Sequence, residues 1–455
     1  MNTSFFGDML QTIADRGRAL IAGRQRRPTA EARTATLIER CEELLSVRGE
    51  ASGTALAREI LFDFQELKTG ERIAFFEALA RIFGPDRERL IKACAAYASE
   101  PADAAAAEVL EASEPRRQEL VRRLNLAPGA TGALVAMREQ LLDALPLRRD
   151  LAPVDHDFAH LLSSWFNRGF LVLRRIDWSS PANVLEKIIR YEAVHEIHDW
   201  DDLRARIDSP DRRCYAFFHP AMVDEPLIFV EVALTPEIPD AIGPILSRGR
   251  TPLNPREATT AAFYSISNTQ RGLTGVTFGS FLLKHVVEEI SRELPNLSTF
   301  VTLSPVPGFM EWLREERAKP DSAALEPADL PALAILDEPG WHADAHKITE
   351  LKPVLGTLAA HYFLAARTKR GRPIDPVARF HLGNGARLER INLMADFSEK
   401  ALTQSAGIMV NYQYVLADIE KNHEAYAEAG EVVTSAAVKR ALRAEKAPRT
   451  LVAQS

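Results

Sequence analysis

Apolar side chains recur at helical spacing through the first third of the chain. One such face is formed by Phe75, Leu79, Ile82 and Phe83, since residues three, four and seven positions apart share one side of a helix. Proline and glycine pairs such as Gly84-Pro85 interrupt these stretches and predict helix ends. The pattern therefore predicts an all-helical domain over residues 1–168, with roughly eight helices and no fixed-period repeat.

After about residue 170 the pattern becomes mixed, with short β-rich runs between helical stretches. The two runs at 214–218 and 227–234 are separated by a turn-like segment and predict a hairpin. Further predicted elements are a strand at 170–173, a Pro- and Ala-rich excursion at 317–340, a helix at 346–368, a last strand at 407–415 and a polar helix at 417–447. We expect an α+β protein whose second domain, residues 169–455, contains a mixed sheet.

A strand, a glycine-bearing loop, a helix and a second strand follow one another between residues 261 and 303. The apolar runs 261–267 and 300–303 predict the strands. The turn contains Gly272, Gly275 and Gly279, and the helix presents an apolar face of Leu283, Val286, Val287, Ile290 and Leu294. Such a loop offers backbone N–H groups beside a helix N-terminus, and both favour an anion. The unit is typical of a phosphate or pyrophosphate site.

The loop itself resembles the Q/R-x-x-G-x-G/A loop of GNAT-type acyltransferases, whose backbone amides bind the pyrophosphate of coenzyme A. The residues concerned are Gln270, Arg271, Gly272, Leu273, Thr274, Gly275 and Val276. A tight turn whose glycines pack against a helix explains the same pattern, so the loop alone does not decide between the two.

Ser304 follows the second strand of this unit, in the segment LSPVPGF. Because Pro305 cannot extend a sheet ladder, Ser304 is expected at the carboxyl end of a strand, where open α/β sheets place their chemistry. The alternative is that its hydroxyl caps the helix expected to begin near Met310.

His381 precedes an Asn-Gly pair in the segment FHLGNGA, which predicts a turn over 380–386. Histidine exchanges protons near neutral pH, although an isolated histidine is more often structural. His342 and His346 flank Asp344 with metal-like spacing, but no further ligand lies nearby, so we expect no metal site.

Composition excludes several classes of protein. An apolar content of 46% and a charged content of 26% are those of a soluble globular protein, and the net charge of −7 argues against a nucleic-acid partner. Three separated cysteines fit a reducing compartment. Without an apolar stretch of about 18 residues or a secretory h-region, the sequence predicts a cytoplasmic protein that does not cross a membrane.

Six segments together resemble the malonyl-CoA decarboxylase family. They are YEAVH, HPAMVDEPLIFVEVALT, FYSISNTQRGLTGV, TLSPVPGF, FHLGNGARLERIN and MVNYQY, in the family's order between about residues 190 and 415. The resemblance implies a GNAT-like catalytic domain that converts malonyl-CoA to acetyl-CoA and CO2 without a metal or organic cofactor. It places the catalytic pair on Ser304 and His381 and coenzyme A binding on residues 270–276. Residues in or near these segments that could support the site are Ser265, Ser267, His219, Asn384 and Tyr412.

The expected chemistry explains these residue types. Loss of CO2 from a malonyl thioester leaves an enolate, which hydrogen-bond donors at Ser304 or at nearby backbone amides would stabilise. A proton must then reach the α-carbon, and we expect a protonated His381 to supply it.

Two other functions bind the same ligand and stay open at this point. One is a GNAT-type acyltransferase that moves an acyl group from coenzyme A to an amine, and the other is a non-catalytic acyl-CoA-binding protein. We also expect a homo-oligomer, a dimer or a tetramer, assembled through the helical domain because many of its apolar positions need cover.

Overall fold

The computed structural model describes residues 29–276 and 282–442, and the chain separates into two compact units. One unit comprises Met1–Ser164 together with the hexapeptide Arg271–Val276. The other comprises Trp165–Gln270 and Thr277–Ser455. Gly279, one of the three loop glycines singled out in the sequence, lies outside the described residues.

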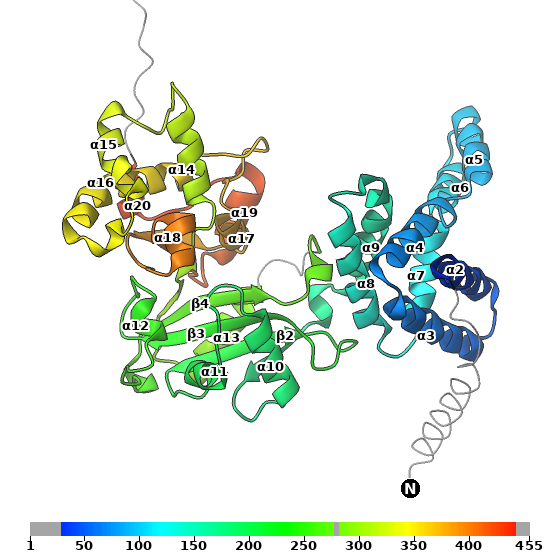
Figure 1. Cartoon of the computed structure of the whole chain (residues 1–455), viewed down its shortest axis with the longest axis horizontal. Helices are drawn as coiled ribbons and strands as arrows, with labels where there is room; N and C mark the ends of the chain where they lie inside the picture. Colours follow the sequence, from blue (N-terminus) through cyan, green and yellow to red (C-terminus); the bar gives the residue numbers. More distant parts are fainter. Residues whose placement is uncertain (1–28, 277–281, 443–455) are drawn as a thin grey trace, which may run out of the picture. The chain divides into compact units, whose positions relative to one another are not determined.

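The first unit is helical, and its described part contains eight α-helices (Figure 1). They are α2 (Ala30–Ser46), α3 (Glu50–Glu66), α4 (Thr69–Arg81), α5 (Arg87–Ser99), α6 (Asp103–Ser113), α7 (Arg116–Leu124), α8 (Ala130–Ala144) and α9 (Ala152–Trp165). Phe75, Leu79 and Phe83 are buried as their spacing predicts, whereas Ile82 at the end of α4 is 38% exposed. The prediction of a helical first domain is confirmed for the described part of this unit, although α4 ends at Arg81, before Ile82 and Phe83.

The second unit is built on one eight-stranded sheet. Its strands are β1 (Val172–Ile176), β2 (Arg212–Phe218), β3 (Pro226–Thr235), β4 (Thr260–Asn268), β5 (Thr299–Thr302), β6 (Ser304–Pro305), β7 (Arg387–Asn392) and β8 (Met409–Gln413). The order is β1-β2-β3-β4-β5-β8-β6, and β7 also pairs with β8. Only β4 and β5 pair in parallel among these strands, which is the arrangement expected for a strand–helix–strand unit. The α+β class is confirmed, as is the predicted hairpin of β2 and β3.

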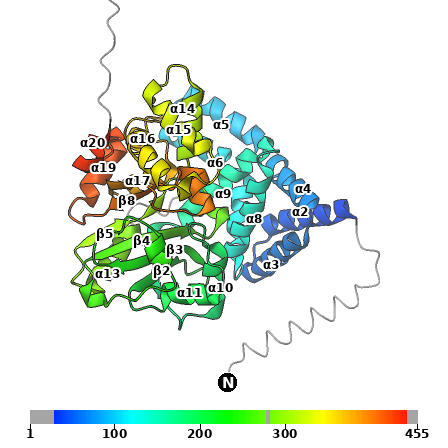
Figure 2. The same cartoon turned by 60° about the vertical axis from the view of Figure 1, so that its left-hand side comes forward.

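Successive side chains of a strand point to opposite faces of the sheet. Both faces of the strands β2 to β4 carry buried side chains, and helices cover both faces. On one face, Cys214 and Ala216 pack with apolar residues of α10 (Ala182–Tyr191) and α11 (Trp200–Ile207). Figure 2 shows these two helices beside β2. On the opposite face, Arg213 and Tyr215 hydrogen-bond to Glu293 at the end of α13 (Leu282–Glu293). Four of the five residues of the predicted apolar face are buried in α13, which confirms that helix, whereas Leu294 lies just beyond its end.

Eight further helices belong to the described part of this unit, most of them short. They are α12 (Gly243–Leu246), α14 (Phe309–Ala318), α15 (Leu330–Ala334), α16 (Ala345–Leu364), α17 (Pro376–Gly383), α18 (Glu399–Ser405), α19 (Ile419–Ala429) and α20 (Ala436–Ala441). One prediction is wrong here, because Phe380–Gly383 belongs to helix α17 rather than to a turn. The side chain of Asp375 caps this helix and Pro376 occupies its first turn, and both favour helix over turn. Among the described helices, none combines the length and apolar character needed to cross a membrane.

The sheet opens between β4 and the strand that follows β5. Parallel pairing ends at Phe263 and Thr302, and the Leu303 N–H still donates to the Phe263 carbonyl at 2.9 Å. Ser304 then pairs with Val410 of β8, while β4 continues to Asn268. One edge of β4 therefore leaves its neighbour at the point where Ser304 begins.

Candidate active site

A cavity of about 230 Å³ lies where β4 and β6 separate. Its walls come from β4, from the start of β6 and from α17. The lining residues are Val194, Phe263, Tyr264, Ile266, Asn268, Ser304, Pro305, Pro376, Val377, Phe380 and His381. Among these described residues none is Asp, Glu, Lys or Arg, so the cavity is predominantly apolar with a few polar groups, as small-molecule sites commonly are.

Ser304 and His381 meet at this cavity although 77 positions separate them in the sequence. The Ser304 Oγ lies 3.1 Å from Nε2 of His381 and donates to Oγ1 of Thr302 at 2.9 Å. The backbone N–H of Tyr412 donates to the same Thr302 oxygen at 3.1 Å. Helix α14 starts at Phe309 without a side-chain cap, so the alternative in which Ser304 serves only as a helix cap does not hold.

Two tyrosines fix the ring of His381. The Tyr414 hydroxyl lies 2.8 Å from Nδ1 of His381, and the Tyr412 ring stacks on the imidazole at a centroid distance of 4.6 Å. When the Ser304 hydroxyl donates to Thr302, Nε2–H of His381 donates to Ser304 and Nδ1 accepts from Tyr414. Tyr412 was selected from the sequence, whereas Tyr414 was not. Tyr414 lies two residues after Tyr412 in the same MVNYQY segment, and this was the signal in the sequence that could have identified it.

Burial determines the protonation of His381. The side chain is 3% exposed, and its desolvation lowers the pKa from 6.5 to about 3. The imidazole is therefore neutral in the free protein near pH 7. The expectation that a protonated His381 supplies the proton stays a prediction. In the free protein burial works against it, because the described residues around the ring supply neutral hydroxyls and aromatic rings rather than a carboxylate.

Ser265 and Ser267 make no hydrogen bond to Ser304 or His381 among the described contacts. Both hydroxyls donate to the buried carboxylate of Glu192, Ser265 at 2.7 Å and Ser267 at 3.3 Å. The same carboxylate accepts the backbone N–H groups of Val194 and His195, each at 2.8 Å. The two serines thus anchor the turn that carries Val194, a lining residue of the cavity.

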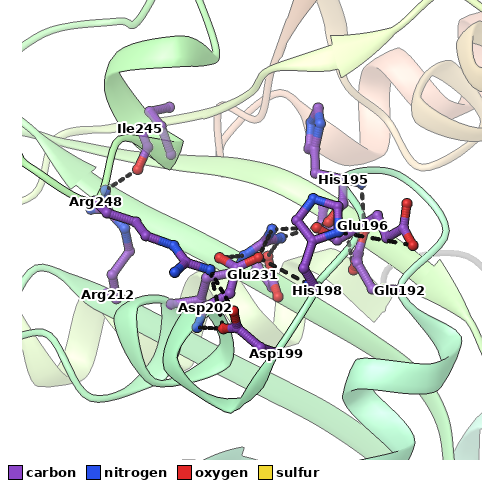
Figure 3. A network of polar contacts seen from close by, with 12 residues as sticks. Glu192, His195, Glu196, His198, Asp199, Asp202, Arg212, Glu231, Ile245 and Arg248 are labelled. Carbon is purple, nitrogen blue, oxygen red and sulfur yellow. Dashed lines mark hydrogen bonds and ion pairs between the residues drawn. The ribbon is translucent and has the colours of Figure 1, made fainter. Parts of the chain in front are cut away.

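This turn belongs to a larger polar network (Figure 3). Arg206 donates to the His195 carbonyl at 2.7 Å and to the Glu231 carboxylate at 3.3 Å. Glu231 is fully buried, and its desolvation raises the pKa to about 8. Side chains of α11 and β3 therefore hold the wall of the cavity in place.

His219 and Asn384 also lie outside the Ser304–His381 pair. His219 donates from Nε2 to the Trp165 carbonyl at 3.1 Å and accepts the Ala221 N–H on Nδ1. Asn384 donates from its side chain to the Phe380 carbonyl at 2.8 Å, at the end of α17. Both side chains bond to backbone groups, His219 across 54 positions to Trp165 and Asn384 within its own helix, as structural residues commonly do.

The glycine loop belongs to the helical unit, where it lies against α8. Residues Arg271–Leu273 form a 3₁₀ turn, and the Gly272 carbonyl accepts from Arg138 at 2.8 Å. A Cβ on Gly272 would lie 1.9 Å from the Val135 carbonyl oxygen, so this glycine permits close packing. Gln270, in contrast, belongs to the sheet-containing unit, where its side chain donates to the Pro226 carbonyl of the same unit at 3.3 Å. The assignment of residues 270–276 to coenzyme A stays a prediction.

The remaining loop residues fit the same turn. Leu273 and Val276 are buried, the Thr274 hydroxyl donates to the Arg271 carbonyl, and Gly275 has a positive φ of 79°. Arg271 is exposed and pairs with Glu139 and Asp143 of α8.

Two family models match the chain. The model described as the malonyl-CoA decarboxylase C-terminal domain matches residues 169–452, and the one described as the malonyl-CoA decarboxylase N-terminal domain matches residues 83–166. Mitochondrial malonyl-CoA decarboxylase of Anser anser anser is 36% identical over 397 residues, which are 80% of this chain and 78% of the relative. The enzyme of Mus musculus is 37% identical over 392 residues, 79% of each chain.

Solved structures agree with these matches. The malonyl-CoA decarboxylase of Rhodopseudomonas palustris has a TM-score of 0.87 and 58% identity, covering 90% of this chain and 99% of that one. The enzyme of Agrobacterium vitis has a TM-score of 0.86 and 53% identity, covering 90% of this chain and all of that one. The chain belongs to the malonyl-CoA decarboxylase family.

Proposed function

We propose that this protein converts malonyl-CoA to acetyl-CoA and CO2 in the cavity between β4 and β6. The observation that carries this proposal is the contact of 3.1 Å between Ser304 Oγ and His381 Nε2 at the cavity wall. A polar pair in an otherwise apolar cavity supplies donors at one point, which is what an enolate oxygen requires.

The pantetheine arm of coenzyme A is proposed to run along β4. Beyond Phe263, the edge of β4 that faced β5 continues along Tyr264, Ile266 and Asn268, which line the cavity. A strand edge offers N–H and C=O groups to an extended ligand with amides of its own. As the family resemblance implies, we propose that the backbone amides of residues 270–276 receive the pyrophosphate of coenzyme A.

The apolar walls favour loss of CO2. The C–C bond to the carboxylate breaks, its electron pair forms the thioester enolate, and neutral CO2 leaves. The negative charge is localised on the carboxylate before the reaction and is spread over the enolate as CO2 leaves. Because the apolar walls of the cavity solvate a localised carboxylate poorly, they disfavour the starting state. Ser304 and His381 are the proposed donors to the enolate oxygen or to the carboxylate that precedes it.

A proton must then reach the α-carbon. Because burial keeps His381 neutral, we propose that its Nε2–H is delivered to the α-carbon through the Ser304 hydroxyl. As Nε2–H leaves, the Tyr414 hydroxyl is proposed to pass its own proton to Nδ1, so the imidazole stays neutral and the negative charge moves to the Tyr414 oxygen. One proton per turnover is finally taken from solvent, which balances the reaction.

No organic cofactor or metal is required by this route, because the thioester itself accepts the electron pair. We propose a cytoplasmic location, supported by three cysteines that form no disulfide. An oligomer through the helical domain is supported by its exposed apolar side chains, among them Leu110 at 74%, Leu126 at 66% and Leu147 at 90%.

Incubation of the purified protein with malonyl-CoA alone tests the proposal. We expect acetyl-CoA and CO2 in equal amounts, with a rate that does not depend on an added amine. An acyltransferase would instead need the amine and would leave the malonyl group intact on it. Binding without turnover would indicate a non-catalytic acyl-CoA-binding protein.

A further inference from the structure

Helix α17 carries His381 but has only eight residues, from Pro376 to Gly383. A helix of this length is marginal unless its ends are fixed, because the first turn leaves its N–H groups without helical partners. The side chain of Asp375 accepts the Ala378 N–H at 2.7 Å, and its carbonyl accepts the Arg379 N–H at 3.1 Å. Asp375 therefore fixes the first turn of the helix.

The second carboxylate oxygen of Asp375 makes a different contact. It accepts the hydroxyl of Tyr362 at 3.2 Å, and both side chains are about 1% exposed. Tyr362 lies near the end of α16, and its ring packs on Phe309 and Trp312 of α14 at centroid distances of 5.5 and 5.1 Å. The carboxylate thus ties α17 to the aromatic cluster at the start of α14.

That cluster continues directly from the segment that carries Ser304. A Cβ on Gly308 would lie 2.8 Å from the Tyr362 hydroxyl, so this hydroxyl abuts the turn four residues after Ser304. On its other side it meets Asp375, six residues before His381. One buried hydroxyl therefore touches both chain segments that supply the Ser304–His381 pair.

The far end of α17 is fixed as well. Gly385 has a φ of 81°, and a Cβ there would lie 2.1 Å from the Ile419 carbonyl oxygen. With that end immobile, the position of His381 depends on how the first turn is held.

We propose that Asp375, acting through Tyr362, is a positioning residue that sets His381 against Ser304. It contacts neither member of the pair in the described structure and acts by holding the two segments in register. The proposal rests on the decarboxylase reaction proposed above. Misplacement of a reacting group by about 1 Å can lower the rate on the order of 10²-fold, so loss of the Asp375–Tyr362 contact should appear mainly as a lower kcat.

The test compares three variants at the Asp375–Tyr362 contact with one control. Asp375→Ala should lower kcat by about 10- to 100-fold and leave KM for malonyl-CoA within about threefold, because the proposed coenzyme A contacts lie on β4 and on residues 270–276 rather than on Asp375. Asp375→Asn should recover kcat to within about threefold of wild type, since its amide oxygen can cap the helix and its NH₂ can donate to Tyr362. Tyr362→Phe should lower kcat by a smaller factor, about 3- to 10-fold, with unchanged KM.

Asp86→Ala is the matched control. Asp86 caps α5 in the helical unit with the same kind of contact, accepting two backbone N–H groups at 3.1 Å. Asp86 is exposed, so this variant should lose less thermal stability than Asp375→Ala, and it should keep wild-type kcat and KM.

Four results would overturn the inference. They are a wild-type kcat in folded Asp375→Ala, a kcat in Asp375→Asn as low as in Asp375→Ala, a wild-type kcat in Tyr362→Phe, and an equal loss of kcat in the control. If Asp375→Ala does not fold, the two near-isosteric variants decide. Inactive wild-type protein would refute the proposed function instead, so the two failures are distinguishable.

Discussion

Acidification should destabilise the sheet-containing unit through His381 in particular. The unfolded chain binds a proton on this imidazole below about pH 6.5, whereas burial keeps the folded imidazole neutral down to about pH 3. The contribution of His381 to stability is therefore fully present above about pH 6.5 and is lost as the pH falls toward 3. At pH 5 the gap is about 1.5 pH units, which corresponds to about 2 kcal/mol.

The experiment compares wild type with His381→Gln, whose amide can hydrogen-bond but does not titrate. All five tryptophans belong to the sheet-containing unit, so their fluorescence follows the unfolding of that unit in denaturant. Between about pH 7 and pH 5 wild type should lose about 2 kcal/mol more unfolding free energy than the variant. His195, whose pKa burial also lowers to about 4, contributes equally to both proteins and cancels.

An exposed histidine provides the control, since His346→Gln should keep the acid response of wild type. Equal acid sensitivity of wild type and His381→Gln would refute the reasoning, because it would mean that folding does not change the titration of His381.

Three further predictions concern turnover and the loop. In steady-state assays at several pH values, kcat/KM should not fall around pH 6.5 as the pH rises, because burial keeps His381 neutral there. If an imidazolium were the proton donor, kcat/KM would fall about tenfold per pH unit above its pKa. Ser304→Ala should lower kcat by about 10²–10³-fold, and Ser265→Ala should act less strongly because its hydroxyl bonds to Glu192; the reverse order would show that the wrong serine was chosen. Gly272→Val should lower the melting temperature and raise KM for malonyl-CoA. Gly275→Ala, whose new methyl group meets open space at a positive φ, should lower the free energy of unfolding by only about 1 kcal/mol. Equal effects of the two variants on stability would argue against the close approach of Gly272 to α8.

Local patterns predicted much of the fold because they record which face of an element is buried. The spacing of Leu283, Val286, Val287 and Ile290 predicted α13, and all four side chains are buried. Strand β7 was not predicted. Its sequence RLERIN does not alternate strictly, because Glu389 and Arg390 are adjacent polar residues, and its charged residues, among them Arg387 and Arg390, are typical of an exposed segment. In the structure these two arginines bond to Gln413 and Asn411 of the paired strand β8.

The site was less predictable because it depends on contacts between distant segments. Spacing alone placed Ser304 near a strand end but did not pair it with His381, and only the family resemblance joined the two. Alternation shows that Ser265 and Ser267 share a face, but only the fold places Glu192 on that face. The protonation of His381 depends on its complete burial, which no local pattern records.

The most direct test of the central claim is whether Ser304 and His381 act as one unit on malonyl-CoA. Acetyl-CoA formation should be measured for wild type, Ser304→Ala, His381→Gln and the double variant under saturating malonyl-CoA. Residues that act together give strongly non-additive losses, so the double variant should be within about threefold of the slower single variant. If the two losses instead multiplied, or if either single variant kept wild-type kcat, the contact of 3.1 Å between these side chains would not be the catalytic pair.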